Sequence, residues 1–192
     1  MIRSYRKDFW HDQPEHVEIW CERDAIIGSI ESLTDELGVV VRVGRGFVST
    51  TKIHEIAQVI YNTKKPFTAF YLGDHDPSGR LIEHDLQQRI EAYGVEFSMK
   101  RLAIHTADIQ RFKLPPLLAK ESDTRTRRFL QQFKNTCVEV DALPPSELRR
   151  RVEQAVRSKL DQKKWERAVQ VEKIELQSIQ DFVKLWPKQA GA

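Results

Sequence analysis

Two aspartates one residue apart are the side chains of this sequence best suited to chemistry. Asp74 and Asp76 lie in residues 73–79, Gly-Asp-His-Asp-Pro-Ser-Gly, directly after an apolar run over residues 67–72. That run predicts a buried strand, and the helical spacing of apolar residues over 81–90 predicts a helix after it. Two carboxylates side by side suit a hard cation such as Mg²⁺, although the same residue types also form ordinary strand-to-helix turns.

Glu22 is a third carboxylate in a comparable position, at the end of a predicted strand over residues 17–22. The first and third strands of an α/β sheet can be neighbours, so Glu22, Asp74 and Asp76 would converge on one edge. Three like charges repel at close range, and a bound cation relieves that repulsion at neutral pH. Taken alone, Glu22 is also explained as a charge at the start of a helix. His75 is expected to point away from the aspartates.

The elements that would position these groups alternate along the chain. Helical spacing follows most predicted strands, and the strands themselves are expected over residues 17–22, 39–43, 67–72, 95–104 and 138–143. Alternation of this kind predicts an α/β fold with a mostly parallel, Rossmann-like sheet flanked by helices. Ser49 and Ser78 are expected to cap helices, and Gly38 is expected to end one.

Three regions are expected along the chain. Residues 1–16 form an N-terminal strap, residues 17–145 form the α/β domain, and residues 146–192 form a long C-terminal helical extension. The helix of this extension is expected to run as far as Trp186.

The bulk composition describes a globular protein with a polar surface. The chain has 192 residues, of which 40% are hydrophobic and 31% charged, and its net charge of +3 permits nucleic-acid binding without requiring it. No apolar run approaches the roughly 20 residues of a membrane span, and no signal peptide is visible. Cys21 and Cys137 are expected to be buried free thiols, which fits a cytoplasmic protein.

Three stretches together resemble the Toprim domain of topoisomerases and primases. They are residues 20–25 (Trp-Cys-Glu-Arg-Asp-Ala), 44–49 (Gly-Arg-Gly-Phe-Val-Ser) and 73–79. The resemblance covers about residues 17–105 and is closest to the A subunit of topoisomerase VI and the related meiotic double-strand-break protein. It implies that Glu22, Asp74 and Asp76 are catalytic residues that bind Mg²⁺ or Mn²⁺, with Glu22 as the general acid or base acting on DNA phosphodiesters.

One departure from that subgroup concerns the nucleophile. The topoisomerase VI subunit carries a catalytic tyrosine on a winged-helix domain ahead of its Toprim domain, and residues 1–16 do not provide such a domain. Tyr5 is expected to pack rather than to react. The site would therefore hydrolyse DNA, or serve a winged helix and tyrosine supplied by a separate protein or domain.

Two further segments carry groups able to contact phosphate. Gly44, Arg45 and Gly46 would offer backbone N–H groups and one positive charge, although a lone Gly-x-Gly is also a common tight turn. Residues 110–136 hold seven basic residues against two acidic ones, including Lys120, Arg125, Arg127 and Arg128. Such a segment either follows a DNA backbone or is a solvated loop.

Glu139 and Asp141 form a second acidic pair, for which a structural role is favoured over a place near the metal.

The sequence favours a Mg²⁺-dependent module that cleaves or nicks DNA in the manner of a nuclease or topoisomerase. The alternative is a non-catalytic Toprim module that binds DNA or a partner within a larger DNA-processing assembly. A third interpretation, a small-molecule phosphotransferase, lacks a Lys-bearing phosphate loop.

Overall fold

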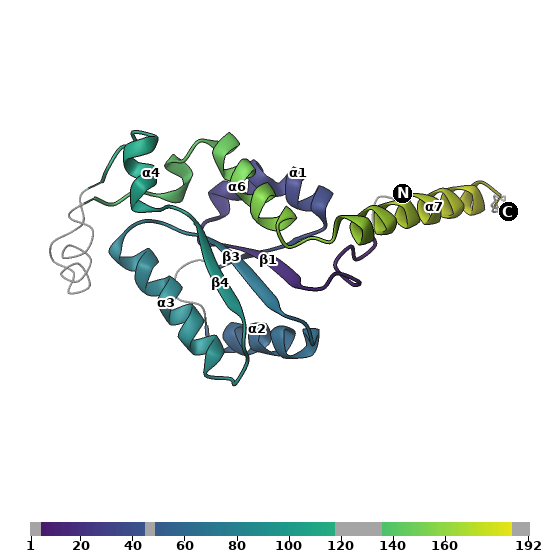
Figure 1. The fold of residues 1–192 in the computed structure, drawn as a ribbon, viewed down its shortest axis with the longest axis horizontal. Helices are drawn as coiled ribbons and strands as arrows, with labels where there is room; N and C mark the ends of the chain where they lie inside the picture. Colours follow the sequence, from purple (N-terminus) through teal and green to yellow (C-terminus); the bar gives the residue numbers. More distant parts are fainter. Residues whose placement is uncertain (1–4, 45–48, 118–135, 186–192) are drawn as a thin grey trace, which may run out of the picture.

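The structure, a computed structural model, describes residues 5–44, 49–117 and 136–185. Within these ranges the chain forms a four-stranded parallel sheet in the order β2-β1-β3-β4, flanked by helices (Figure 1). The strands are β1 (His16–Cys21), β2 (Val40–Val43), β3 (Phe67–Leu72) and β4 (Ser98–Ala103). Every pairing between them is parallel. The predicted α/β fold is thereby confirmed.

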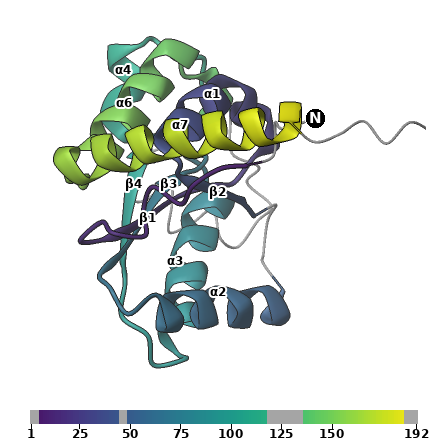
Figure 2. The ribbon, with the colours of Figure 1, turned by 90° about the vertical axis from the view of Figure 1, so that its right-hand side faces the viewer.

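Helices cover both faces of the sheet (Figures 1 and 2). One face carries α1 and α6, which contact each other, and the opposite face carries α2 and α3. The bounds of these helices are α1 (Ile27–Leu37), α2 (Thr50–Thr63), α3 (Pro77–Glu91) and α6 (Pro145–Arg157). A short 3₁₀ helix, η1 (Asp24–Ile26), precedes α1, and α4 (Thr106–Arg111) follows β4.

Alternation along β1 supplies both hydrophobic layers. Ile19 belongs to the core under α1 and α6, whereas Trp20 belongs to the core under α2 and α3. Successive strand residues point to opposite faces, so one buried strand can serve two layers. The free thiols of Cys21 and Cys137 are both buried, as expected.

Local capping signals in the sequence hold for two helices. Gly38 ends α1 in the left-handed conformation, with φ of 64°, which glycine adopts without strain. The side chain of Ser49 caps α2 by accepting a hydrogen bond from the Lys52 N–H. Ser78 does not cap α3, because that position is taken by Asp76, two residues earlier.

The predicted strand over residues 138–143 is wrong. Val138 makes only an isolated antiparallel bridge with His75, and Val140–Ala142 form a 3₁₀ helix, η2. The Val140 N–H donates to Asp74 Oδ1 at 2.8 Å instead of joining a strand ladder. The run therefore turns instead of extending, and the buried Asp74 carboxylate satisfies the backbone donor that a strand would have used.

The prediction of a single long C-terminal helix is also wrong, because α6 ends at Arg157 and a separate helix, α7 (Gln162–Leu185), follows. Asp161 begins α7 as a helix cap, its Oδ1 accepting from the Lys164 N–H at 3.1 Å. The backbone of Asp161 is held in turn by Gln13. The division into three regions along the chain stays a prediction.

The N-terminal segment (residues 5–15) lies along α7 (Figure 2). The Tyr5 hydroxyl donates to Glu175 Oε2 at 2.6 Å, and the Lys7 N–H donates to Glu172 Oε2 at 2.6 Å. Phe9 is buried and its ring meets that of Trp165 edge to face, with centroids 6.3 Å apart. Tyr5 thus makes a hydrogen bond to α7 in this structure, and its predicted packing role stays a prediction.

Replacing Gln13 by Ala is expected to lower the free energy of unfolding by about 1–3 kcal/mol. Gln13 is buried; its Oε1 accepts from the Asp161 N–H at 2.7 Å, and its Nε2 donates to the Asp161 carbonyl at 3.3 Å. Urea unfolding would measure the loss. Gln177→Ala is the matched control, since Gln177 is exposed and bonds only within α7 to Asp181. Equal midpoints for the two variants would contradict the role assigned to Gln13.

No helix in the part of the chain that the structure describes is long and apolar enough to cross a membrane.

Candidate functional site

The structure brings the three predicted carboxylates to one edge of the sheet. Glu22 directly follows β1 and Asp74 follows β3 after one residue, and these two strands are paired in parallel, with Cys21 opposite Leu72. A pocket of about 500 Å³ opens there, lined by Glu22, Arg23, Asp24, Ala25, Asp74, Asp76 and Ser78. Adjacent parallel strands end at the same edge of a sheet, which explains the convergence. The chemical roles of the three stay predictions.

Glu22 is held in a fixed orientation by the turn that follows β3. Its Oε2 accepts from the Asp74 N–H at 3.0 Å and from the Tyr71 hydroxyl at 3.4 Å. Burial raises the pKa of Glu22 to about 7, and the negative charges of Asp74 and Asp76 add to the rise. The hydrogen bond from the Asp74 N–H and the positive charge of Arg101 partly offset it. Glu22 therefore exchanges its proton close to neutral pH.

Two glycines of the 73–79 segment leave the room that Glu22 occupies. A Cβ on Gly73 would lie 2.3 Å from Tyr71 Cε1 and 3.0 Å from Glu22 Oε2. A Cβ on Gly79 would lie 2.7 Å from the Asp74 carbonyl oxygen and 3.0 Å from Glu22 Oε2. The contacts with the Tyr71 ring and the Asp74 carbonyl oxygen are too short for a real Cβ, so these two groups require glycine, and the Glu22 carboxylate adds a tight contact at both positions.

Asp74 is buried and both of its carboxylate oxygens are engaged. Oδ1 accepts from the Val140 N–H at 2.8 Å, and Oδ2 accepts from Arg23 Nε at 2.7 Å. The same guanidinium reaches Glu139, with Nη2 2.7 Å from Oε1. Burial raises the pKa of Asp74, although the Val140 N–H and Arg23 oppose the rise.

Asp76 reaches the pocket from the start of α3. Its Oδ1 accepts from the Gly79 N–H at 2.6 Å and so caps the helix, with Pro77 at the first helical position. His75, between the two aspartates, is fully buried and is not among the residues that line the pocket. Burial lowers the pKa of His75 to about 4, so its ring is neutral at physiological pH.

Sequence reasoning missed two arginines at this edge. Arg23 follows the strand-ending Glu22 directly, and that adjacency was the available signal. Arg101 comes from β4, and its Nη1 donates to the carbonyls of Gly73 at 2.7 Å and Asp74 at 3.1 Å. Its Nε donates to Glu83 Oε2 on α3 at 2.8 Å. Arg101 therefore holds the turn that carries Asp74 against both β4 and α3.

The donor set is chemically suited to a hard cation, since three carboxylates line one pocket. As they stand, however, no three His, Cys, Asp or Glu side chains among residues 5–44, 49–117 and 136–185 are arranged to hold a metal ion. Arg23 already provides the positive charge beside Asp74. An ion would therefore compete with this arginine.

The other predicted phosphate contacts are largely outside the described residues. Gly44 follows β2, and its N–H donates to the Cys21 carbonyl at 2.9 Å, which ties this loop to the end of β1. Arg45 and Gly46 lie outside the described ranges, as do Lys120, Arg125, Arg127 and Arg128. Glu139 reaches the site through Arg23, whereas Asp141 is exposed.

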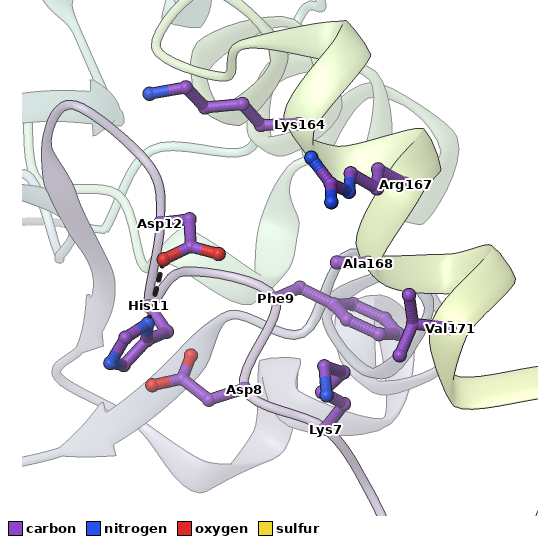
Figure 3. Close-up of a pocket in the computed structure, with 9 residues that line it drawn as sticks. All are labelled: Lys7, Asp8, Phe9, His11, Asp12, Lys164, Arg167, Ala168 and Val171. Carbon is purple, nitrogen blue, oxygen red and sulfur yellow. Dashed lines mark hydrogen bonds and ion pairs between the residues drawn. The ribbon is translucent and has the colours of Figure 1, made fainter. Parts of the chain in front are cut away.

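A second hollow, of about 740 Å³, lies between the N-terminal segment and α7 (Figure 3). It is at the end of the sheet where β1 begins, away from the carboxylates that follow the strands. Phe9 points toward Ala168 and Val171 of α7, and Lys164 and Arg167 face Asp12 and its hydrogen-bond partner His11 across the opening. Charged side chains of both signs around an aromatic contact are typical of an interface between two packed segments rather than of a reactive centre.

The fold and this site define an α/β protein with a carboxylate-lined pocket at the carboxyl edge of a parallel sheet. No protein-family model matches the chain, and no curated protein matches it either.

Proposed function

We propose that this protein is a Mg²⁺-dependent module of the Toprim type that acts on DNA phosphodiesters. The observation that carries the proposal is the convergence of Glu22, Asp74 and Asp76 on one pocket at the ends of the adjacent strands β1 and β3. The sheet order and the chain order of the Glu, Gly-x-Gly and Asp-x-Asp stretches support the Toprim assignment.

The residues of the pocket suit such a reaction in distinct ways. Glu22, Asp74 and Asp76 would hold the ion, which when bound supplies positive charge to the phosphodiester oxygens. In the metal-free protein burial raises the pKa of Glu22 to about 7, and the positive charge of a bound ion would favour its ionised form, as a general base requires. Tyr71 and the Asp74 N–H fix its orientation, and Arg101 fixes the backbone that supplies that N–H.

DNA as the substrate is supported by charge and resemblance. The chain is basic overall, and the predicted phosphate contacts add local positive charge; they are Arg45, Lys120, Arg125, Arg127 and Arg128. Cleavage then takes one of two courses, hydrolysis by this chain or attack by a tyrosine from a separate winged-helix protein or domain.

The second candidate is a non-catalytic Toprim module that binds DNA or a partner. One observation favours it: both carboxylate oxygens of Asp74 already accept hydrogen bonds, one from the Val140 N–H and one from Arg23, with which an ion would compete. In such a module the Asp74–Arg23–Glu139 contacts would be purely structural.

A nicking assay with supercoiled plasmid separates the two candidates. Asp76→Asn is expected to abolish nicking in Mg²⁺ or Mn²⁺ and to leave the melting temperature nearly unchanged, because Asn caps a helix as well as Asp does. The matched control is Asp85→Asn, which makes the same change on α3 at a residue that only pairs with Arg89. This control should nick like wild type.

Wild-type protein could fail to nick both alone and with a tyrosine-bearing winged-helix partner, and its melting temperature could be unchanged by either ion. That result would favour the second candidate, the non-catalytic binding module. Stabilisation by an ion without nicking until the partner is added would identify a catalytic half-site.

A further inference from the structure

Arg23 has an unusual position for a residue beside a prospective metal ligand. Its Nε lies 2.7 Å from Asp74 Oδ2, and its Nη2 lies 2.7 Å from Glu139 Oε1. One planar guanidinium therefore links a carboxylate that is 4% exposed to one that is 41% exposed. Arginine suits this task because its fork presents several N–H donors in fixed directions.

The geometry leaves Asp74 without an unengaged oxygen. The Val140 N–H that holds Oδ1 belongs to the backbone of η2, which is anchored by its buried Val140 side chain. The Arg23 contact at Oδ2 is made by a side chain that is 35% exposed and that lines the pocket. The arginine is consequently the partner that an incoming ion can displace.

Glu139 lowers the cost of that displacement. If Arg23 leaves Asp74, its Nη2 contact with Glu139 can persist, so the guanidinium keeps one partner and stays at the pocket. Separating a buried carboxylate from its cation costs free energy when neither group gains a new partner. Here the ion would replace Arg23 at Asp74, and Glu139 would retain Arg23.

We propose that Arg23 serves as the counter-cation of Asp74 in the metal-free protein, that a divalent ion displaces it, and that the guanidinium, retained by Glu139, then binds a DNA phosphate. This proposal rests on the proposed function, and it assigns Arg23 and Glu139 a role in coupling ion binding to DNA binding. Guanidinium groups match phosphate geometry, which makes a released Arg23 a suitable contact for the substrate backbone.

The first test measures Mn²⁺ affinity without DNA, by calorimetry on the full chain. Arg23→Gln is expected to bind Mn²⁺ roughly tenfold more tightly than wild type, since the competitor is gone. Glu139→Gln is expected to bind it more weakly, because released Arg23 has lost its second partner. Should Arg23→Gln fold poorly by circular dichroism, Arg23→Lys replaces it; Lys keeps the charge but cannot bridge both carboxylates, so a smaller gain is expected.

The double variant distinguishes this role from simple charge effects. If Glu139 acts through Arg23, its substitution should no longer change Mn²⁺ affinity once Arg23 is Gln. Additive effects of the two substitutions would overturn the proposal, since Glu139 would then act on the ion directly through space.

The second test measures the salt dependence of DNA binding, with Ca²⁺ as the ion and with EDTA. Arg23→Gln should reduce the log–log slope by about 0.9, the value of one phosphate contact, in Ca²⁺ and leave it unchanged in EDTA. An equal reduction in both buffers would overturn the coupling. Unchanged Mn²⁺ affinity in Arg23→Gln, beside normal nicking by wild type, would overturn this inference alone. Absence of Mn²⁺ binding in every variant would overturn the proposed function as well.

Discussion

Glu22→Gln is expected to lower metal-dependent nicking by about 10²–10⁴-fold, the usual contribution of a general acid or base. Glutamine keeps the shape of the side chain and can still accept from the Asp74 N–H, but it cannot exchange a proton. The plasmid assay measures the loss. Glu96→Gln is the matched control, because Glu96 is an exposed residue that does not line the carboxylate pocket.

The same substitution has a pH signature in metal-free buffer. The pKa of Glu22 is raised to about 7 in the folded protein, from an ordinary value of 4.5. The folded state therefore binds more protons than the unfolded state between these values, and the free energy of unfolding falls as pH rises from about 4.5 to 7.

Glu22→Gln removes this fall, so the variant should be more stable than wild type at pH 8, by on the order of 2 kcal/mol after allowance for solvent screening at the open pocket. At pH 5 the two proteins should be close in stability. Urea unfolding in EDTA at both pH values measures the difference. A constant difference across pH would contradict the raised pKa of Glu22.

Gly79→Ala is expected to destabilise the protein by about 1–3 kcal/mol and to abolish nicking. The new methyl group would lie 2.7 Å from the Asp74 carbonyl oxygen, which is backbone held by Arg101, and 3.0 Å from Glu22 Oε2. Neither neighbour can move without disturbing the other, so the turn and the carboxylate shift together.

Gly28→Ala provides a control with the opposite sign. Gly28 lies in α1 with no atom within 4 Å of its added Cβ, so the better helix propensity of alanine should stabilise the protein by about 0.5–1 kcal/mol. Urea unfolding of both variants makes the comparison. If the Gly79→Ala and Gly28→Ala variants were equally stable, the 73–79 turn would have space for a Cβ at position 79, which would contradict the prediction.

The sequence by itself determined the layered framework and the carboxylates at its edge. β-Branched and apolar runs predict the strands around Ile19 and Phe70, and helical spacing predicts the intervening helices, because these signals depend only on neighbouring residues. Gly38 and Ser49 are found at the helix ends where their backbone and side-chain chemistry places them. Parallel neighbours of this kind also explain why Glu22 and Asp74 meet.

Only the tertiary structure decided the features that depend on contacts between distant residues. Where Val140 turns rather than extends, Asp74, 66 positions earlier, takes its N–H, and Gln13 holds the break before α7 across 148 positions. Arg101 and Arg23 reach the site for the same reason. Periodicity in a sequence records which face of an element is buried, but not which distant polar group will satisfy its backbone or its charge.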